Sequence, residues 1–436
     1  MWATDRLTGA QSFCVGFIDI QDDGECPRQI NATVAGQVLT EMEQEVENVE
    51  VHLENGNAMD LTDEVGSYAF PNMPIGGDYE IKPLKDTDYL DGISTLDLIM
   101  IQRHILGIET FDSPYKYLAA DIDDNESIDG VDLVELRKLI LGIYNELPQN
   151  DSWRFVSKEY QFSDPFNPWL ADISESYQLI DLSSNMVVDF VGVKVGDINN
   201  DAVLYFDDAL STRTNSVVNF AVPTQKLGVD KVESLMVYSD NYQGISGWQG
   251  TLEYDASMIE IIEILPQSLS LTPDNYYINA EAGYIAFSYH NFTTEDIDYG
   301  SPLFELKIRA KSEFSSVREI LDMTSTIVKS EAYNIEEGTA EIAIVDYVTD
   351  QSRILSVNPN PFIETAEIQY YSPYSSEVAE FEFYDLNGQL LYKSSVHSDL
   401  GVNNLTISRE HLAVSGFVYV RMQIQGEVSD FRMILL

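Results

Sequence analysis

Carboxylate-rich loops between residues 86 and 132 carry the clearest chemical signal in the sequence. In one twelve-residue loop, oxygen-bearing side chains stand at positions 1, 3, 5, 7, 9 and 12, and these are Asp121, Asp123, Asn125, Ser127, Asp129 and Asp132. Calcium takes about six to eight oxygen ligands, and such a loop offers side chains at positions 1, 3, 5 and 12, a backbone carbonyl at 7 and a water at 9. The loop therefore predicts a calcium site, although position 12 is Asp where an EF-hand has Glu. The predicted ligands are Asp121, Asp123, Asn125, Ser127 and Asp132.

A second loop in the same register precedes it by 132 − 97 = 35 residues. Its predicted ligands, at positions 1, 3, 5, 7 and 12, are Asp86, Asp88, Leu90, Gly92 and Asp97. The Leu90 side chain offers no oxygen, so we expect weaker calcium binding here, or the use of a backbone carbonyl or of Asp91. The alternative is that the carboxylates of both loops only solvate the chain and cap helices, since Asp97 and Asp132 fall in first helical turns.

Helices must position these loops, because each loop runs into the only stretches of the sequence with a helical apolar period. One apolar face contains Leu96, Leu98, Ile99, Ile101, Ile105 and Leu106, and the other contains Val131, Leu133, Val134, Leu136, Leu139, Ile140 and Leu141. Gly107 and Gly142 follow the last periodic residues, where a helix often ends in a left-handed residue. The segment 86–147 is therefore predicted to be a repeated loop and helix.

The rest of the chain alternates apolar and polar residues between turn signals, which predicts a mainly β, multi-domain protein built of β-sandwich modules. The predicted boundaries are 1–30, a β-sandwich at 31–85, the helical pair at 86–147, a β-rich lead-in at 148–212, a β-sandwich at 213–348 and a terminal β domain at 353–436.

Composition excludes some functions. With 24 basic and 73 acidic residues, the net charge of −49 excludes a nucleic-acid binder that neutralises phosphates. No apolar run approaches the roughly 18 residues of a transmembrane segment, and the first residues lack the features of a signal peptide. Such an excess of acid is typical of extracellular conditions, where divalent cations neutralise carboxylates, and it also keeps a protein soluble. The two cysteines, Cys14 and Cys26, form either one local disulfide or two buried thiols.

Enzyme signatures are missing from the sequence. The five histidines fall in separate modules, and none lies in an HExxH motif or beside a GxSxG serine. Every segment is assigned to a small module, so we predict a protein without catalytic activity, although a glycosidase carboxylate pair is defined by distance in space and leaves no sequence pattern.

Two weaker patterns have alternative interpretations. Asp197, Asn199 and Asp201 form half of a calcium loop without a following helix, and the alternative is an acidic turn. A second set of residues could make a sugar-stacking platform, although aromatic residues at strand spacing more often belong to a core. These are Trp248, Tyr276, Tyr277, Tyr284 and Tyr289.

The paired loops resemble the type I dockerin repeat, most closely in DIDDNESIDGVDLVELRKLILG at 121–142. The resemblance implies calcium and a protein-docking role, because dockerins dock on cohesin β-sandwiches. Residues 213–348 resemble a cohesin-like sandwich through VESLMVYSDNYQGISGWQGTLEYD, GYIAFSYH and YGSPLFELKIRAK. We therefore expect a cohesin-like partner for the helical pair, in another protein or in this chain, where the pair would act as an internal clamp.

Other segments resemble modules of bacterial surface proteins. Residues 31–85 resemble a Cna-B or carboxypeptidase-regulatory-like module through VENVEVHL and TDEVGSYAFPNMPIGGDYEI, and residues 1–30 look like the tail of a truncated immunoglobulin-like repeat. Residues 353–436 resemble the C-terminal sorting domain of type IX secretion cargo in Bacteroidetes, through VNPNPF, FEFYDLNGQLLY and SGFVYVRMQIQGEVSDFRMILL. That family implies recognition by the type IX translocon.

These observations predict a non-catalytic, calcium-stabilised scaffold or adhesion protein, exported by type IX secretion to the outer cell surface or the extracellular medium. One alternative is a carbohydrate-binding subunit that associates with polysaccharide. Another is the appended region of a glycoside hydrolase in polysaccharide catabolism.

Overall fold

The structure is a computed structural model of the chain. It describes residues 2–4, 11–13, 31–202, 213–223, 228–298, 300–312, 320–334, 338–347 and 351–436. Two short strands, β1 (Trp2–Thr4) and β2 (Gln11–Phe13), form an antiparallel pair. The predictions for Cys14, for Cys26 and for most of the segment 1–30 lie outside the described residues.

The first sandwich is built from two stretches of chain that are far apart in the sequence, 31–84 and 153–194. One sheet has the order β10-β3-β11-β8, with β6 also paired to β3, and the other has the order β5-β4-β7-β9. Side chains from both stretches, such as Val34 and Phe190, fill the core between the sheets. The strands are β3 (Asn31–Thr40), β4 (Glu50–Glu54), β5 (Ala58–Leu61), β6 (Ser67–Pro74), β7 (Tyr79–Leu84), β8 (Trp153–Ser157), β9 (Tyr177–Leu179), β10 (Met186–Val187) and β11 (Phe190–Lys194).

This pairing differs from the division expected from sequence, which ends the first sandwich at 85 and treats 148–212 as a lead-in to the next one. Ile81 pairs with Tyr177, and Val38 pairs with Phe190. The physical reason is that β9, β10 and β11 are short strands, which gain stability only by joining a sheet. They join the two sheets formed by residues 31–84.

The helical module, residues 86–147, is therefore an insertion between β7 and β8. It contains α1 (Thr95–Ile105), α2 (Pro114–Ala120) and α3 (Gly130–Ile140). Ser94 and Asp129 are the N-caps of α1 and α3, and each forms a capping box with the Asp three residues later. Gly107 and Gly142 have φ values of 67° and 69°, which confirms the predicted left-handed ends of both helices.

The second sandwich covers residues 213–347, and its strands are hydrogen-bonded in the order β15-β18-β13-β12-β21-β20-β14-β17-β16, with β19 paired to β14. Its first and last strands, β12 and β21, run parallel and are paired from Arg213 to Pro223. The strands are β12 (Arg213–Pro223), β13 (Val232–Ser239), β14 (Ile245–Tyr254), β15 (Ile259–Pro266), β16 (Tyr276–Asn279), β17 (Tyr284–Glu295), β18 (Phe304–Ala310), β19 (Leu321–Thr324), β20 (Glu331–Asn334) and β21 (Gly338–Tyr347).

The C-terminal sandwich has one sheet of order β22-β23-β26 and one of order β25-β24-β27-β28. Arg353 at its start donates to the Tyr347 hydroxyl and to the Gly300 carbonyl of the second sandwich, at 3.0 and 2.8 Å. The elements are β22 (Arg353–Asn358), β23 (Thr365–Ser372), β24 (Glu377–Tyr384), β25 (Leu390–Ser398), β26 (Gly401–Ser408), α4 (Arg409–Leu412), β27 (Gly416–Ile424) and β28 (Glu427–Leu435).

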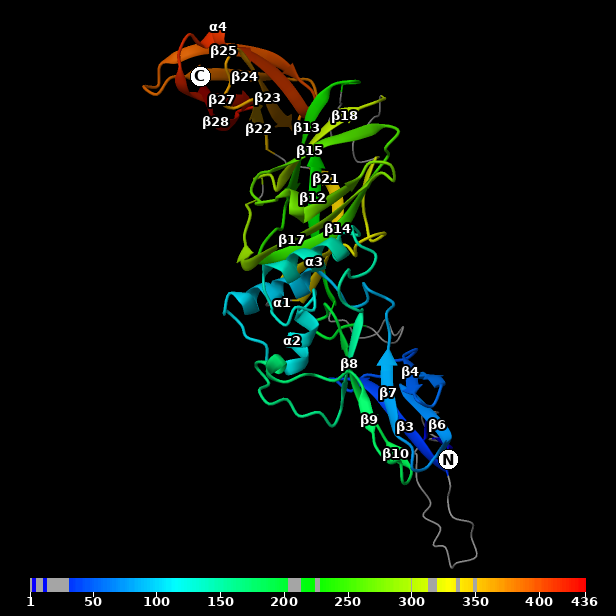
Figure 1. Cartoon of the computed structure of the whole chain (residues 1–436). Helices are drawn as coiled ribbons and strands as arrows, with labels where there is room; N and C mark the ends of the chain where they lie inside the picture. Colours follow the sequence, from blue (N-terminus) through cyan, green and yellow to red (C-terminus); the bar gives the residue numbers. More distant parts are fainter. Residues whose placement is uncertain are drawn as a thin grey trace, which may run out of the picture.

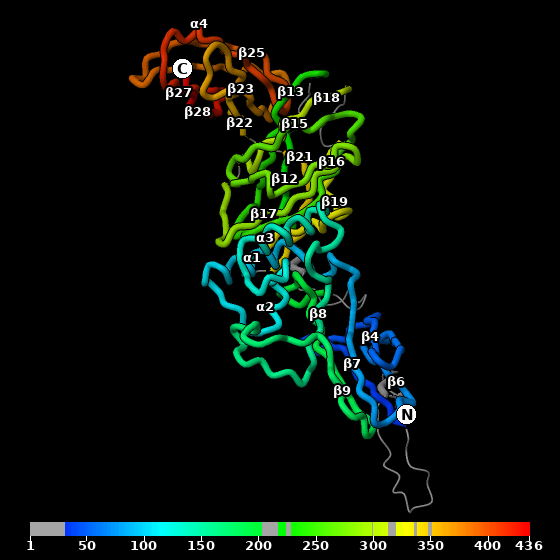
Figure 2. The backbone as a smooth tube through the Cα atoms, in the orientation of Figure 1, coloured from blue at the N-terminus to red at the C-terminus, as the bar shows by residue number. Residues whose placement is uncertain are grey.

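The modules are stacked into an elongated molecule (Figure 1). The first sandwich, the helical module, the second sandwich and the C-terminal sandwich follow one another along its length, and the two chain ends lie at opposite ends (Figure 2). The mainly β, multi-domain class is confirmed. Among the described residues, every helix is too short or too polar to span a membrane.

Candidate metal centre at a domain junction

The loop between α2 and α3 brings three of its predicted ligands together. Carboxylate oxygens of Asp121, Asp123 and Asp132 lie within 4.8 Å of one another. Asp121 follows the last residue of α2, and Asp132 lies in the first turn of α3, so the two helix ends fix both side chains. We call this group, together with the predicted ligands Asn125 and Ser127 of the same loop, site A.

Backbone amides shape site A. The Asp121 carboxylate accepts hydrogen bonds from the amides of Asn125 and Glu126, at 2.9 and 3.0 Å. The Asp132 carboxylate accepts from the amides of Ile122 and Asp129, both at 2.8 Å. These bonds close the loop on itself and turn the carboxylates toward its interior.

Two observations show that the backbone amides compensate the negative charges of site A only in part. Oδ1 of Asp123 is buried and has no hydrogen-bond partner in the described part of the chain. Burial raises the pKa of Asp121 to about 6 and also raises the pKa of Asp132. A cation among these oxygens would offset the cost of removing the negative charges from water.

The loop before α1 is arranged differently from its sequence prediction. Asp86 accepts hydrogen bonds from the Ser152 amide, at 2.9 Å, and from the Tyr89 hydroxyl. The backbone carbonyl of Asp88 accepts from Lys194, at 2.8 Å. The Leu90 side chain is exposed. The structure therefore does not gather Asp86 and Asp88 around Asp97.

Asp97 instead meets residues 197–202, which lie a hundred positions later in the chain. Its carboxylate accepts from the amide of Ile198 and from the amide of Ser94, at 2.8 and 2.9 Å. The Asp197 carboxylate accepts from the amides of Asp201 and Ala202, at 3.2 and 3.0 Å. We call the group formed by Asp97, Asp197, Asn199 and Asp201 site B.

Sites A and B share one hydrogen-bond pattern. The Asp197 carboxylate accepts hydrogen bonds from the backbone amides four and five residues later in the chain, and the Asp121 carboxylate does the same in site A. The Asp97 carboxylate accepts a hydrogen bond from the amide of Ile198, the residue after Asp197. In the same way, the Asp132 carboxylate accepts from the amide of Ile122, the residue after Asp121. Residues 197–202 thus correspond to loop positions 1–6 and residues 92–97 to positions 7–12, so site B repeats the hydrogen-bond pattern of the site A loop with two separate segments.

The join between these two segments is tight. A Cβ atom added to Gly92 would lie 2.5 Å from the backbone of Ala202, and Gly92 has a φ of 72°. In site A a peptide bond connects the residues at the corresponding positions, Glu126 and Ser127. In site B the backbones of Gly92 and Ala202 come close together at this point without a covalent bond. Only glycine allows this approach, because any side chain at position 92 would collide with Ala202.

Burial makes negative charge unfavourable on the carboxylates of Asp97 and Asp197 in site B. Asp97 is fully buried, and burial followed by the nearby charges of Asp197 and Asp201 raises its pKa well above the usual value. Burial and Asp201 also raise the pKa of Asp197 to about 7. The buried carboxylates of Asp97 and Asp197 and the exposed carboxylate of Asp201 repel one another unless protons or a cation neutralise them.

Site B adjoins a seam between the helical module and the second sandwich. The amide of Thr95 donates to Oε1 of Gln249, and its hydroxyl lies 2.7 Å from the Ser288 hydroxyl. On α3, Nη2 of Arg137 lies 3.2 Å from Nδ1 of His290, and burial lowers the pKa of that histidine to about 3. The helical module thus packs on β14 and β17 of its own chain, as expected for an internal clamp.

The apolar core of the helical module extends into both neighbouring sandwiches. It includes Leu98 and Leu136 of the helices, Val193 of the first sandwich, and Ala286 and Val328 of the second. Because these side chains form one cluster, the module contributes to the burial of apolar surface on both sides.

The predicted aromatic platform is mostly core. Trp248 and Tyr289 are buried in the second sandwich. Tyr276 packs against the same core, and Tyr277 and Tyr284 pack against the core of the helical module. The five rings therefore do not form one open surface for stacking on sugar.

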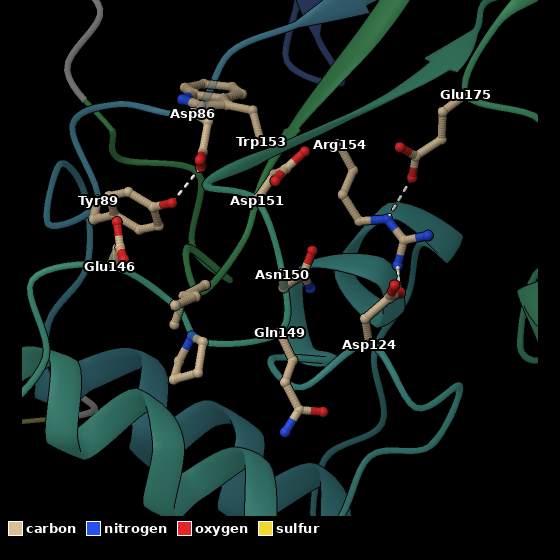
Figure 3. A pocket seen from close by; sticks show the side chains of 12 residues that line it. Asp86, Tyr89, Asp124, Glu146, Gln149, Asn150, Asp151, Trp153, Arg154 and Glu175 are labelled. Atoms are coloured by element: carbon tan, nitrogen blue, oxygen red, sulfur yellow. Dashed lines mark hydrogen bonds and ion pairs between the residues drawn. The ribbon is translucent and has the colours of Figure 1, made fainter.

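A polar cavity of about 450 Å³ lies between the helical module and the first sandwich (Figure 3). Arg154 crosses its wall and pairs with Asp124 at 2.8 Å and with Glu175 at 2.6 Å. Nε1 of Trp153, another lining residue, is buried and has no hydrogen-bond partner within the described residues. The predicted ligand Asp86 lines this cavity and lies outside sites A and B.

No protein-family model and no curated protein matches the chain. Several of the solved structures that resemble part of it are cohesins. One is from a type I cohesin–dockerin complex of Clostridium thermocellum, with 15% identity over 32% of this chain and 94% of that chain, and a TM-score of 0.25. Another is a type II cohesin dyad of an adaptor scaffoldin from Acetivibrio cellulolyticus, with 7% identity over 51% and 97% of the two chains and a TM-score of 0.24. A third is the type II cohesin A11 of Bacteroides cellulosolvens, with 12% identity over 30% and 97% and a TM-score of 0.24.

Proposed function

We propose that this chain is a non-catalytic, calcium-stabilised scaffold or adhesion protein of the cell surface or the extracellular medium. The observation that carries the proposal is the pair of oxygen-rich sites, A within the helical module and B at its edge, in a module that packs between two sandwiches. Such an architecture suits a protein whose task is to hold modules in a fixed order.

Calcium fits the two sites by the chemistry of their donors. Site A offers three clustered carboxylates, and the loop adds Asn125 and Ser127. Site B offers Asp97, Asp197 and Asp201 with the amide oxygen of Asn199. Hard divalent cations prefer such all-oxygen sets, and zinc and copper prefer nitrogen or sulfur. When bound, the ion would supply positive charge that offsets the repulsion among the carboxylates.

Export and location follow from the resemblances together with the charge. Residues 353–436 form a β-sandwich of their own, which agrees with the size and class of a type IX sorting domain. We therefore propose that the type IX translocon reads this domain. A chain of net charge −49 gains stability where free calcium is abundant, as outside the cell.

The proposed docking partner of the helical module is the cohesin-like sandwich of the same chain. The hydrogen bonds of Thr95 to Gln249 and Ser288 support docking within the chain. The face of α1 that packs on β14 and β17 is thereby covered, so a partner protein would have to bind elsewhere.

Calorimetric titration tests the calcium proposal. We expect the chelator-treated full chain to bind two calcium ions, with a higher melting temperature in excess calcium than in chelator because the ions bind the folded state preferentially. Asp132→Asn should remove one ion and Asp197→Asn the other. Asp86→Asn is the matched control, since Asp86 belongs to neither site, and it should leave both ions in place. Failure of the chain to bind calcium, or the loss of an ion in Asp86→Asn, would contradict the proposal.

Polysaccharide binding is a second candidate, which the polar cavity of Figure 3 favours. Sugar hydroxyls both donate and accept hydrogen bonds, and the lining supplies carboxylates, the amides of Gln149 and Asn150 and the Arg154 guanidinium. Pull-down on insoluble polysaccharides should then retain the chain, and Gln149→Ala should weaken retention. Gln389→Ala, on the exposed surface of the C-terminal sandwich, is the control. Equal retention of the two variants would exclude this cavity as the binding site.

A further inference from the structure

The two sites lie at different seams of the helical module. Site A borders the first sandwich, because Arg154 of β8 pairs with Asp124 at 2.8 Å. The Asn150 side chain, just before β8, donates to the carbonyl of Asp121 at 2.9 Å. We call this contact between the helical module and the first sandwich the first seam.

Site B borders the second sandwich. Thr95 lies two residues before Asp97. Its amide donates to Gln249 of β14, and its hydroxyl is hydrogen-bonded with the Ser288 hydroxyl of β17, each at 2.7 Å. Thr95 and Ser288 are fully buried, and Gln249 is nearly so. We call this contact between the helical module and the second sandwich the second seam.

Site B also includes the chain that leads into the second sandwich. Residues 197–202 supply three of its four residues, Asp197, Asn199 and Asp201, and β12 of the second sandwich begins at Arg213. A cation bound between Asp97 and Asp197 would therefore hold the connecting segment 197–202 against the start of α1. Residues of site A are instead joined directly by the continuous loop 121–132.

Removal of a cation should act differently at the two sites. In site A the loop is continuous, so repulsion among Asp121, Asp123 and Asp132 distorts a single segment. In site B the segments 92–97 and 197–202 touch without a covalent join, so repulsion can separate them. Asp97 is fully buried and accepts a hydrogen bond from the amide of Ile198, so a movement of residues 197–202 would break this contact of its carboxylate. That movement would expose the hydrogen bonds of Thr95.

We propose that calcium controls the two seams separately: an ion at site A fixes the helical module to the first sandwich, and an ion at site B fixes it to the second sandwich. The inference rests on the calcium proposal above and adds that each ion stabilises a different interface of the helical module. Loss of calcium from site B alone turns the stacked molecule into two parts joined at a hinge.

Hydrogen exchange of the full chain in saturating calcium tests this division. Asp197→Asn should speed amide exchange at least about tenfold in residues 94–100 and 245–252, because a factor of ten corresponds to an opening easier by about 1.4 kcal/mol. Exchange in residues 121–132 and 153–157 should stay within about twofold of the original chain. Asp132→Asn should give the reverse pattern, so each variant is the control for the other.

Folding is checked within the same experiment. Strand β18 lies inside the second sandwich and carries the buried residues Leu306 and Ile308, so its continued protection shows that this sandwich stays folded. Stepwise chelation of the original chain provides a measurement without any substitution, and the radius of gyration from solution scattering should rise when the second seam opens.

The outcomes separate the inference from the proposed function. If the chain binds two ions but both seams loosen together in each variant, or loosen in neither variant, the separate control is overturned and the calcium proposal stands. A chain that binds no calcium would overturn both. Seams that respond singly, each to its own variant, support the inference.

Discussion

Replacing Ile99 by alanine should weaken the second seam and leave the units on either side folded. Ile99 is 1% exposed, yet it is absent from the buried cluster that forms the core of the helical module. Its Cδ1 lies 3.0 Å from the position that a Cβ on Gly247 would occupy. The side chain is therefore buried by docking on β14, where the lack of a side chain at Gly247 leaves room for it.

The magnitude follows from the three carbons that the substitution removes. At about 0.8 kcal/mol for each, the lost transfer free energy is about 2.4 kcal/mol. The cavity left behind brings measured values for such changes to roughly 2–5 kcal/mol. Since the contact lies across the seam, we expect a loss of about 3 kcal/mol in docking, or roughly a hundredfold in the docking equilibrium.

Scanning calorimetry of the full chain in excess calcium measures the effect. In the original chain the helical module and the second sandwich should unfold together, and in Ile99→Ala they should separate into two transitions. Ile108→Ala is the control, because Ile108 belongs to the same module and is 48% exposed. A melting profile of Ile99→Ala that matches that of Ile108→Ala would refute the reasoning.

Three further substitutions have expected outcomes. Burial keeps His290 uncharged in the fold with a pKa of about 3, whereas the pKa of an unfolded histidine is about 6.5. The free energy of unfolding is therefore highest above pH 6.5 and decreases as the pH falls toward 3, by at most about 1.4 kcal/mol per pH unit. His290→Gln should flatten that part of a melting curve series between pH 7 and pH 4.5, and an unchanged slope would contradict the assignment. Thr95→Val removes the hydroxyl beside buried Ser288 and should cost about 1–3 kcal/mol in chemical denaturation, against less than about 0.5 kcal/mol for Thr326→Val on the exposed surface. Gly107→Ala places a Cβ in a left-handed position with open space around it, so backbone strain alone should lower the stability by about 1 kcal/mol, and a neutral effect would mean that α1 ends elsewhere.

Local patterns were sufficient for features that depend on neighbouring residues. The apolar period of α3, the first-turn position of Asp132 and the left-handed Gly142 all follow from residues within a few positions of one another. Even so, the pattern overestimated burial, because Val131 and Val134 are exposed. Periodicity identifies a helix face, whereas burial depends on what covers that face.

Features that join distant segments could not be read in the same way. Asp97 was predicted to be a ligand together with Asp86 and Asp88, because the pattern of a continuous loop groups these three residues. In the fold its neighbours are Asp197 and Asp201, which follow a hundred residues later. The half-loop at 197–201 carried a usable signal, because it lacks its second half and the loop before α1 has a poor first half. The strand pairs of β9 with β7 and of β11 with β3 were missed for a related reason, since an insertion of 68 residues separates β7 from β8.

The parallel pairing of β12 with β21 has a mechanical consequence. These are the first and last strands of the second sandwich, and their partners run in register from Val217 with Glu341 to Pro223 with Tyr347. A pull along the molecule enters β12 at its N-terminal end and leaves β21 at its C-terminal end, so the two strands are drawn past each other. Their hydrogen bonds then share the load in shear and are not peeled apart one after another. A second sandwich with this connectivity resists traction between the two ends of the chain.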